Sequence, residues 1–115
     1  MARHELTKAT DIPSKVRREI YRRDNCRCIL CGRYNNVEAA HYISRAQLGR
    51  GIAQNLVLLC KKCHTDYDGV KRQEIKPMIA SYLAANYKHW DESKLTYNKY
   101  AWLEVDNEAD RPAED

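Results

Sequence analysis

Apolar residues recur with a helical period in the first quarter of the chain. Between residues 15 and 24, Val16 and Ile20 fall on one side with Tyr21 close to them, and four arginines lie among the remaining positions. This pattern is typical of a short amphipathic helix whose apolar stripe packs on a core. Ser14 precedes the helix and can cap the amides of its first turn. We expect the arginines to face solvent or phosphate.

A second apolar stripe follows Pro77, which suits the first turn of a helix because no N–H is needed there. The stripe residues are spaced by three or four positions and are Met78, Ile79, Tyr82, Leu83 and Tyr87. Such spacing predicts a helix that packs this stripe into the core rather than around a ligand. Further aromatic and apolar packing is expected from Trp90, Leu95, Tyr97, Tyr100 and Trp102.

Two shorter apolar runs between these helices predict strands. The first covers residues 37–43, and the second covers residues 55–59 and is bounded by turn residues. Residues 47–54 contain two glycines and predict a flexible loop. We expect a hairpin followed by a helix that begins near His64 and places Asp68 one turn later on the same face.

The length of 115 residues suits one domain. We assign residues 13–103 to it, with a core at 13–69 and a helical extension at 70–103. Residues 1–12 show no periodicity and are expected to form a flexible arm. Residues 104–115 carry six acidic side chains and one arginine, which predicts a disordered acidic tail.

The charge is distributed unevenly along the chain. Residues 1–62 hold 13 Lys and Arg against five Asp and Glu, whereas residues 63–115 hold seven against 11. A basic half suits a polyanion such as nucleic acid. Basic helices are also often ordinary solvated surface, so charge alone does not decide the partner.

Five cysteines are an odd number, which argues against a closed disulfide framework. We see neither a secretory signal nor an apolar run of membrane length, and we expect a cytoplasmic protein without a membrane partner. In a reducing setting, paired cysteines more often hold a metal than form disulfides.

Four of the cysteines form two Cys-x-x-Cys pairs, Cys28/Cys31 and Cys60/Cys63. Each pair can supply two sulfur ligands from one tight turn, and four thiolates suit a tetrahedral Zn²⁺. A site with four sulfur ligands has no open position, so we expect a structural metal. Cys26 does not fit this spacing, and we interpret it as a packed or half-exposed thiol.

Four polar residues remain between and after the cysteine pairs: His41, Asn55, His64 and Asp68. The order of these motifs resembles the HNH endonuclease family, in the small zinc-bearing form common in phages and bacteria. The matching stretches are VEAAHYISR at 37–45 and QNLVLLCKKCH at 54–64. The resemblance covers roughly residues 12–68, and residues 77–100 are similar to an extension of some phage members.

The resemblance implies an α+β fold, a ββα-metal (His-Me finger) hairpin and helix with a structural four-cysteine zinc site, flanked by N- and C-terminal helices. His41 would be the general base, and Asn55 would either pin the loop that orients His41 or lie near the metal. His64 would bind a catalytic divalent ion, Mg²⁺, Mn²⁺ or another. Asp68 matches the position of a further metal ligand in colicin-type members.

The chemistry of phosphodiester hydrolysis agrees with these residue types. A neutral imidazole with a pKa of about 6.5 suits proton transfer from an attacking water. A divalent cation held by an imidazole and a carboxylate can offset the negative charge that develops on the phosphate. Arg45, Arg17 and Arg18 are candidates for DNA phosphate contacts, although solvated surface explains them equally well.

One residue departs from the family pattern. The position before the base is usually Asp or His and helps to bind the metal, whereas here it is Ala40. Either Glu38, two residues earlier on the same strand face, reaches the ion, or His64, Asp68 and water hold it weakly, or activity has been lost.

We therefore expect a metal-dependent endonuclease that nicks or cleaves double-stranded DNA in a bacterial or phage-infected cell. The alternative is a zinc-ribbon DNA-binding or adaptor module that keeps the fold but cleaves weakly or not at all. A further alternative is a nuclease subunit that is active only within a phage packaging or restriction assembly.

Overall fold

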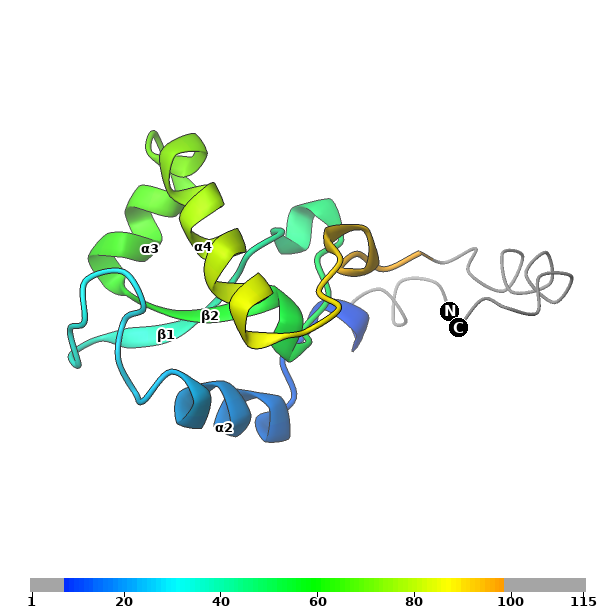
Figure 1. The fold of residues 1–115 in the computed structure, drawn as a ribbon, viewed down its shortest axis with the longest axis horizontal. Coiled ribbons are helices and arrows are strands. Elements are labelled where there is room, and N and C mark those ends of the chain that lie inside the picture. The colour runs from blue at the N-terminus through cyan, green and yellow to red at the C-terminus, as the bar shows by residue number, and fades with distance from the viewer. Residues whose placement is uncertain (1–7, 99–115) are drawn as a thin grey trace, which may run out of the picture.

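A two-stranded antiparallel hairpin forms the centre of the structure, a computed structural model that describes residues 8–98 (Figure 1). Strands β1 (Val37–His41) and β2 (Leu56–Cys60) pair along their full length, with Val37 opposite Cys60 and His41 opposite Leu56. This register brings the start of β1 and the end of β2 next to each other. The ends of the two cysteine motifs therefore meet at one end of the hairpin.

Helices cover the hairpin from two sides (Figure 1). Helix α2 (Ser14–Arg23) lies on one side, and α3 (Lys61–Asp68) and α4 (Arg72–Asn86) lie on the other. Every residue of β2 is buried, as expected for a strand between two layers. Helix α3 begins directly after β2, three residues earlier than the sequence suggested. The expected α+β arrangement, with two strands followed by a helix, is confirmed.

The core has two parts that share the hairpin. The larger part joins cysteines of the two Cys-x-x-Cys pairs and β2 to α3 and α4. It includes Tyr42, Val57, Tyr67, Ile79 and Leu83. The smaller part joins α2 to the start of β2 through Ile20, Ala53 and Leu56. The apolar stripe that predicted α2 thus packs as expected.

Helix α4 begins at Arg72, five residues before Pro77, so the predicted start at Pro77 was wrong. Ile75 continues the buried stripe of Ile79 and Leu83 by one turn toward the N-terminus, and burial of this side chain favours helix there. Met78 was also predicted wrongly, because its side chain is 53 % exposed. It lies one position away from the buried i, i+4 row.

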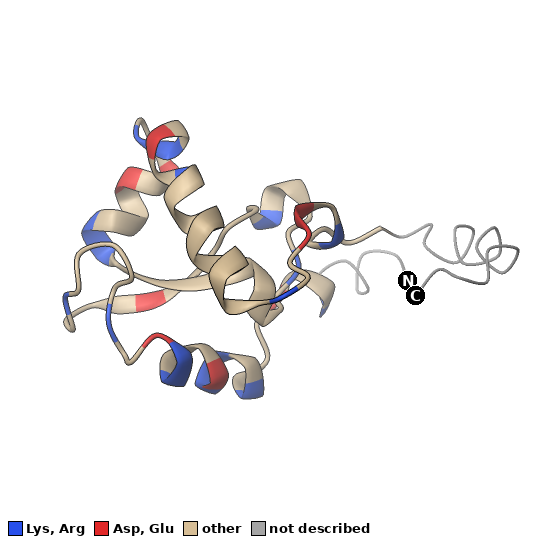
Figure 2. Cartoon of the chain, viewed as in Figure 1, with Lys and Arg blue, Asp and Glu red and all other residues tan. Residues whose placement is uncertain are grey.

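Pro13 is the N-cap of α2, and Ser14 is the first residue inside the helix. No side-chain hydrogen bond caps this end, so the predicted capping role of Ser14 was wrong. Helix α2 shows Lys and Arg along its outer side (Figure 2). Its last arginine, however, faces the interior.

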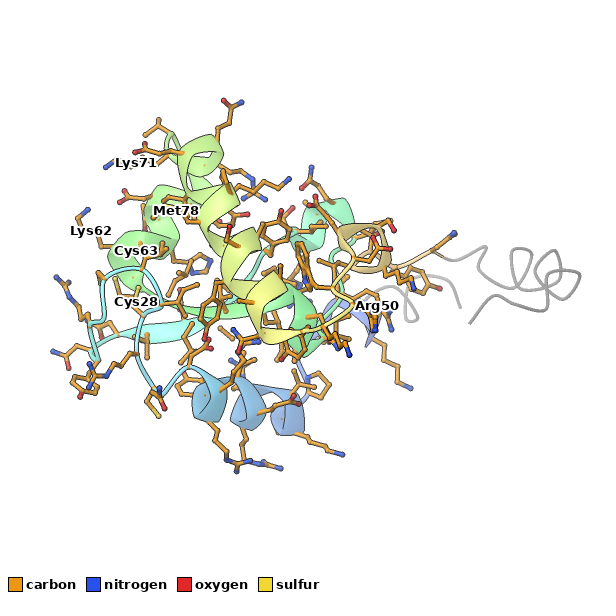
Figure 3. All side chains as sticks on the ribbon, viewed as in Figure 1. Cys28, Arg50, Lys62, Cys63, Lys71 and Met78 are labelled. Atoms are coloured by element: carbon orange, nitrogen blue, oxygen red, sulfur yellow. The ribbon has the colours of Figure 1, made fainter. Side chains whose placement is uncertain are left out.

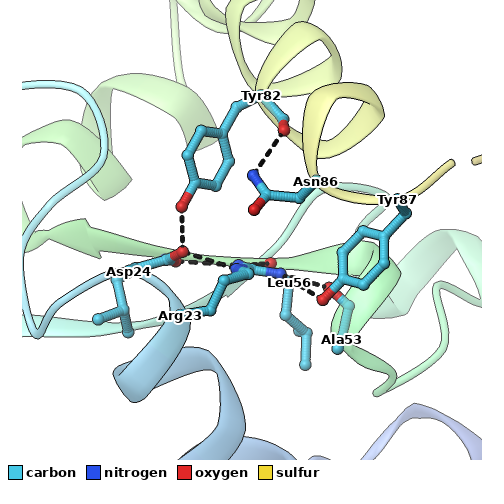
Figure 4. Close-up of polar contacts among 8 residues, drawn as sticks. Arg23, Asp24, Ala53, Leu56, Tyr82, Asn86 and Tyr87 are labelled. Atoms are coloured by element: carbon cyan, nitrogen blue, oxygen red, sulfur yellow. Dashed lines mark hydrogen bonds and ion pairs between the residues drawn. The ribbon is translucent and has the colours of Figure 1, made fainter.

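Arg23 is the centre of a buried polar cluster (Figure 4). Its guanidinium bonds both carboxylate oxygens of Asp24 at 2.6 and 2.9 Å and donates to the carbonyls of Ala53 and Leu56 and to the hydroxyl of Tyr87. Asp24 in turn accepts from the Leu58 N–H at 3.0 Å and from the Tyr82 hydroxyl. The expectation that this arginine faces solvent or phosphate was wrong, because it links α2, β2 and α4.

Residues 8–10 are helical and pack against the loop between the strands, so this part differs from the expected flexible arm. The Thr10 side chain is buried, and the Gly51 N–H donates to the Ala9 carbonyl at 2.9 Å. Residues 1–7, Tyr100, Trp102 and the acidic segment 104–115 lie outside the described residues. Within residues 8–98, no helix has the length and apolar character needed to cross a membrane.

Candidate functional site

Four cysteine sulfurs converge at one end of the hairpin, with all four potential ligand atoms within 4.8 Å of one another. Cys28 and Cys31 lie in the turn before β1, Cys60 ends β2, and Cys63 lies in the first turn of α3. Tetrahedral Zn–S bonds of about 2.3 Å require sulfurs about 3.8 Å apart. The Cys31 and Cys60 sulfurs are 3.6 Å apart, so the residues fit a Zn²⁺ ion.

Local backbone contacts hold these sulfurs in place. The Ile29 N–H donates to the Leu58 carbonyl at 3.0 Å, which fastens the first cysteine turn to β2. The Cys60 sulfur accepts the Cys63 N–H at 3.4 Å and so caps α3. Gly32 closes the first turn with φ of +78°, a conformation that favours glycine.

Burial would raise the pKa of Cys28, but backbone N–H groups, including that of Cys31, lower it to about 7. A thiolate is therefore accessible at neutral pH even before a metal contributes its charge. Cys26 is exposed and does not belong to the cluster. The set of four cysteines predicted from the spacing is thus the set that converges, and it leaves no position for a substrate.

A separate groove of about 400 Å³ runs between β1, α3 and the segment before α2. We call it the catalytic groove after the residues in it that the sequence analysis proposed for catalysis. It brings together six residues that were singled out in the sequence, which are Arg17, Glu38, His41, Arg45, His64 and Asp68. They come from α2, β1, the loop after β1, and α3, so distant segments of the chain combine to form it.

His41 ends β1 and contacts the N-terminal segment. Its Nε2 lies 2.9 Å from the Thr10 carbonyl, and because a carbonyl only accepts, Nε2 carries the proton and Nδ1 is the basic nitrogen. Burial lowers the pKa of His41, and the nearby charges of Arg45 and His64 lower it further against the opposing effect of the Thr10 carbonyl. The ring is therefore neutral at pH 7.

His64 lies between two carboxylates. Its Nδ1 bonds Glu38, which projects from β1, and its Nε2 lies 3.5 Å from Asp68 Oδ2 one turn further along α3. The sequence had predicted the second pair from the i, i+4 spacing. Glu38, His64 and Asp68 do not place three potential ligand atoms within 4.8 Å of one another. Among the described residues, only the four cysteines meet this criterion.

This donor set suits one divalent ion at His64 Nε2 and Asp68, since imidazole and carboxylate are both common ligands of such ions. A carboxylate on the other ring nitrogen is the usual partner of a metal-binding histidine, because it fixes the ring and its tautomer. Glu38 occupies that position. Ala40 is 1 % exposed and packs in the larger core, away from this groove.

Asn55 is fully buried, and its side-chain hydrogen bonds go to backbone. Its Oδ1 accepts the Ile43 N–H at 2.8 Å, and its Nδ2 donates to the carbonyls of Ile43 and Arg50 at 3.1 and 2.9 Å. Gly49 permits this contact, because a Cβ there would lie 1.7 Å from the Ile43 carbonyl oxygen. Asn55 therefore pins the loop that follows His41 and does not line the groove.

The three arginines predicted to contact DNA phosphates differ in whether they line this groove. Arg17 and Arg45 line the groove, and Arg45 forms an ion pair with Asp11. Arg18 is exposed on α2 and is not part of the groove lining. The contacts of Thr10 and Asp11 were missed in the sequence. A backbone carbonyl has no residue signature, and a single aspartate in an aperiodic segment carries no recognisable pattern.

The hairpin, the helix after it and the sulfur cluster define a ββα metal-binding element with a histidine-lined groove beside it. Residues 28–68 match the model of the HNH endonuclease family, so this segment is similar to an HNH endonuclease domain. The match begins at Cys28, ends at Asp68 and covers less than half of the 115 residues. No curated protein matches the chain. A match to this family points to nuclease chemistry with a bound metal and a DNA substrate.

Proposed function

We propose that this protein is a metal-dependent endonuclease that hydrolyses phosphodiester bonds of double-stranded DNA. The observation that carries the proposal is the catalytic groove, where His41 and the His64–Asp68 pair line one surface beside the sulfur cluster. A base and a metal-binding pair in one open groove are the two components that this hydrolysis requires.

His41 is the general base in this proposal. Its Nδ1 accepts a proton from the water that attacks phosphorus, while Nε2–H remains bonded to the Thr10 carbonyl. That bond prevents the ring from adopting the other tautomer and limits its rotation. The lowered pKa of His41 keeps the ring in its basic form at neutral pH.

His64 and Asp68 would hold the divalent ion, and Glu38 would orient His64. When bound, the ion would stabilise the negative charge on the phosphate and on the leaving oxygen. The side chains of Glu38 and Asp68 are 53 and 63 % exposed, which leaves room for phosphate oxygens and water around the pair. Mg²⁺ or Mn²⁺ suits these ligands.

Arg45 and Arg17 would contact the phosphates next to the cleaved bond. Arg45 is paired with Asp11 in the structure, and both side chains are about half exposed. An exposed pair of this kind contributes little to stability. Arg45 can therefore exchange its carboxylate partner for a phosphate at little cost in free energy.

The test is conversion of supercoiled plasmid to nicked or linear DNA by the zinc-loaded protein with added Mg²⁺ or Mn²⁺. We expect cleavage by the parent chain and a loss of at least about 100-fold in His41→Ala, within the usual contribution of a general base. His89→Ala is the matched control, since His89 is exposed outside the groove. Full activity of His41→Ala would contradict the proposal.

A second candidate is a DNA-binding or adaptor module without cleavage. The observation in its favour is Ala40, which lies in the core and supplies no ligand where the family usually has one. This candidate predicts salt-sensitive binding to duplex DNA without cleavage in any divalent ion. Cleavage that appears only with an added partner would instead indicate a subunit of a phage packaging or restriction assembly.

A further inference from the structure

A second hollow, about 800 Å³ in volume, lies beside the catalytic groove, and we call it the basic hollow. Its lining includes three cations, Lys8, Arg50 and Lys94, and one acid, Asp11. All three cations are exposed, and among the described residues none of them forms an ion pair. Asp11 is already paired with Arg45 of the catalytic groove. The hollow therefore carries net positive charge.

The two depressions share one short wall. Asp11 and Pro13 line the basic hollow, whereas Ile12 between them lines the catalytic groove. The Asp11–Arg45 pair also reaches from one depression to the other. A single extended segment thus separates the site proposed for cleavage from the three cations.

The backbone around the basic hollow is held by three segments that lie side by side (Figure 1). The Arg50 N–H donates to the Leu95 carbonyl at 2.8 Å, and the Tyr97 N–H donates to the Leu48 carbonyl at 2.7 Å. The Gly51 N–H donates to the Ala9 carbonyl at 2.9 Å. The three cations therefore project from backbone positions that are fixed relative to one another.

Asn55 connects the two depressions. Its Nδ2 donates to the Arg50 carbonyl, and its Oδ1 accepts from Ile43, two residues after His41. One buried side chain therefore links the loop that follows the proposed base to the backbone of Arg50. This arrangement gives the basic hollow a defined position relative to the bond that would be cleaved.

We propose that the basic hollow binds phosphates of the duplex next to the cleaved linkage, with Arg50 and Lys94 as the main contacts and Lys8 as the third. The inference rests on the proposed function for its ligand, double-stranded DNA. A duplex carries one phosphate per roughly 3.4 Å of axis on each strand, so a strand leaving the catalytic groove presents further phosphates to the hollow within a few base pairs. These contacts position DNA and read no sequence.

Lys94 is partly offset by an acidic neighbour, Asp91. Hydrogen bonds from Ser93 lower the pKa of Asp91, and the charge of Lys94 lowers it further. Arg50 has no part in that interaction. Both Arg50 and Lys94 line the basic hollow and an adjoining depression that contains Lys88 and Asp91. The Arg50 guanidinium can also bond a phosphate through two N–H groups. We therefore expect Arg50 to contribute more to binding than Lys94.

The test measures binding of a duplex of about 25 base pairs to the zinc-loaded His41→Ala chain by fluorescence anisotropy between about 50 and 200 mM salt. Adding Arg50→Gln and Lys94→Gln removes two cations. At about 0.9 per phosphate contact, the slope of log K against log salt should fall in magnitude by about 1.8. When salt is raised fourfold over this range, the fold-decrease in the binding constant should be about tenfold smaller for the variant than for its parent.

The matched control is Lys62→Gln with Lys71→Gln, which removes the same charge from the opposite end of the molecule (Figure 3). This control should keep the parent slope, and Arg50→Lys should keep most of the binding. Thermal melting verifies that each variant is folded. An unchanged slope in the Arg50/Lys94 variant, an equal change in the control, or no DNA binding by the parent would overturn the inference.

The salt slope and the plasmid cleavage test together distinguish a failure of this inference from a failure of the proposed function. Binding needs no cleavage, so a slope change alongside an uncut plasmid supports the basic hollow and contradicts the nuclease. Plasmid cleavage with an unchanged slope supports the nuclease and contradicts the basic hollow.

Discussion

The cysteine cluster and the catalytic groove lie on the same ββα element but differ in construction. Cys28 and Cys60 are 2 and 1 % exposed, and the cluster offers four equivalent ligands to one ion. The groove has two exposed carboxylates around His64, and among the described residues no three ligand atoms converge there. A structural metal site closes its coordination sphere, whereas a catalytic one needs open positions for substrate.

The difference also concerns the free energy of folding. The cluster ties together the turn before β1, the end of β2 and the start of α3, so its ion would stabilise the whole domain. The groove residues lie on the surface of elements that are already packed, and Glu38 and Asp68 contribute little to the core. Removing a ligand should therefore affect stability at the cluster and chemistry in the groove.

The largest expected effect comes from breaking the cluster. Cys60→Ser removes a buried ligand and weakens the sulfur cap on α3. Since apparent zinc-binding free energies reach about 10 kcal/mol in small domains, we expect loss of one zinc per chain and loss of cooperative thermal unfolding. Metal analysis and circular dichroism melting measure both effects.

Cys26→Ser is the matched control, because Cys26 is exposed outside the cluster. It should retain one zinc and the parent melting temperature. If Cys60→Ser kept its zinc and melted like the parent, the cluster could not be the metal site on which the fold depends.

A smaller and different effect is expected from Glu38→Gln. The amide oxygen can still accept the His64 Nδ1 proton, but the charge that fixes the ring is lost. The Mn²⁺ concentration for half-maximal plasmid nicking should rise about 10- to 100-fold, while the melting temperature stays the same. The variant should recover most of its rate at saturating Mn²⁺.

Glu74→Gln serves as the control, because Glu74 is exposed in the first turn of α4. Its metal dependence should equal that of the parent. A fall in the melting temperature of Glu38→Gln with unchanged metal dependence would assign Glu38 to folding. The cysteine cluster and the groove would then not differ in their contributions to stability and to chemistry.

The smallest effect concerns pH. Because burial lowers the pKa of His41 from its usual 6.5, the ring should titrate below pH 6.5 in the zinc-loaded protein, as measured by NMR of the imidazole. The unfolded chain binds this proton at the usual pKa and the folded chain resists it, so the free energy of unfolding falls as pH drops from about 7 through the folded pKa.

His41→Gln should reduce this pH dependence of stability, which urea unfolding at about pH 7 and about pH 5.5 can measure. A His41 pKa at or above 6.5 would show that the ring is solvated and would weaken its assignment as a buried, oriented base.

Residue spacing was sufficient to predict the parts of the fold that depend on local geometry. Two Cys-x-x-Cys turns give two ligands each, and the i, i+4 pair of His64 and Asp68 meets on α3. An apolar run bounded by turn residues identified β2, because a strand buried between two layers is apolar throughout. The run that identified β1 is less regular, since this strand includes the exposed Glu38. The metal cluster and most groove residues could therefore be identified from the sequence.

Other features follow from contacts between distant segments. The carbonyl of Thr10 orients His41 across 31 positions, and Arg23 turns from the solvent side of α2 to carbonyls 30 and 33 residues away. Neither contact has a sequence signature, because every residue has a carbonyl and exposed and buried arginines look alike in a sequence. Local periodicity thus defined the elements and the metal ligands. The orientation of His41 and the placement of Arg50 beside the groove depend on how the packed core brings those elements together.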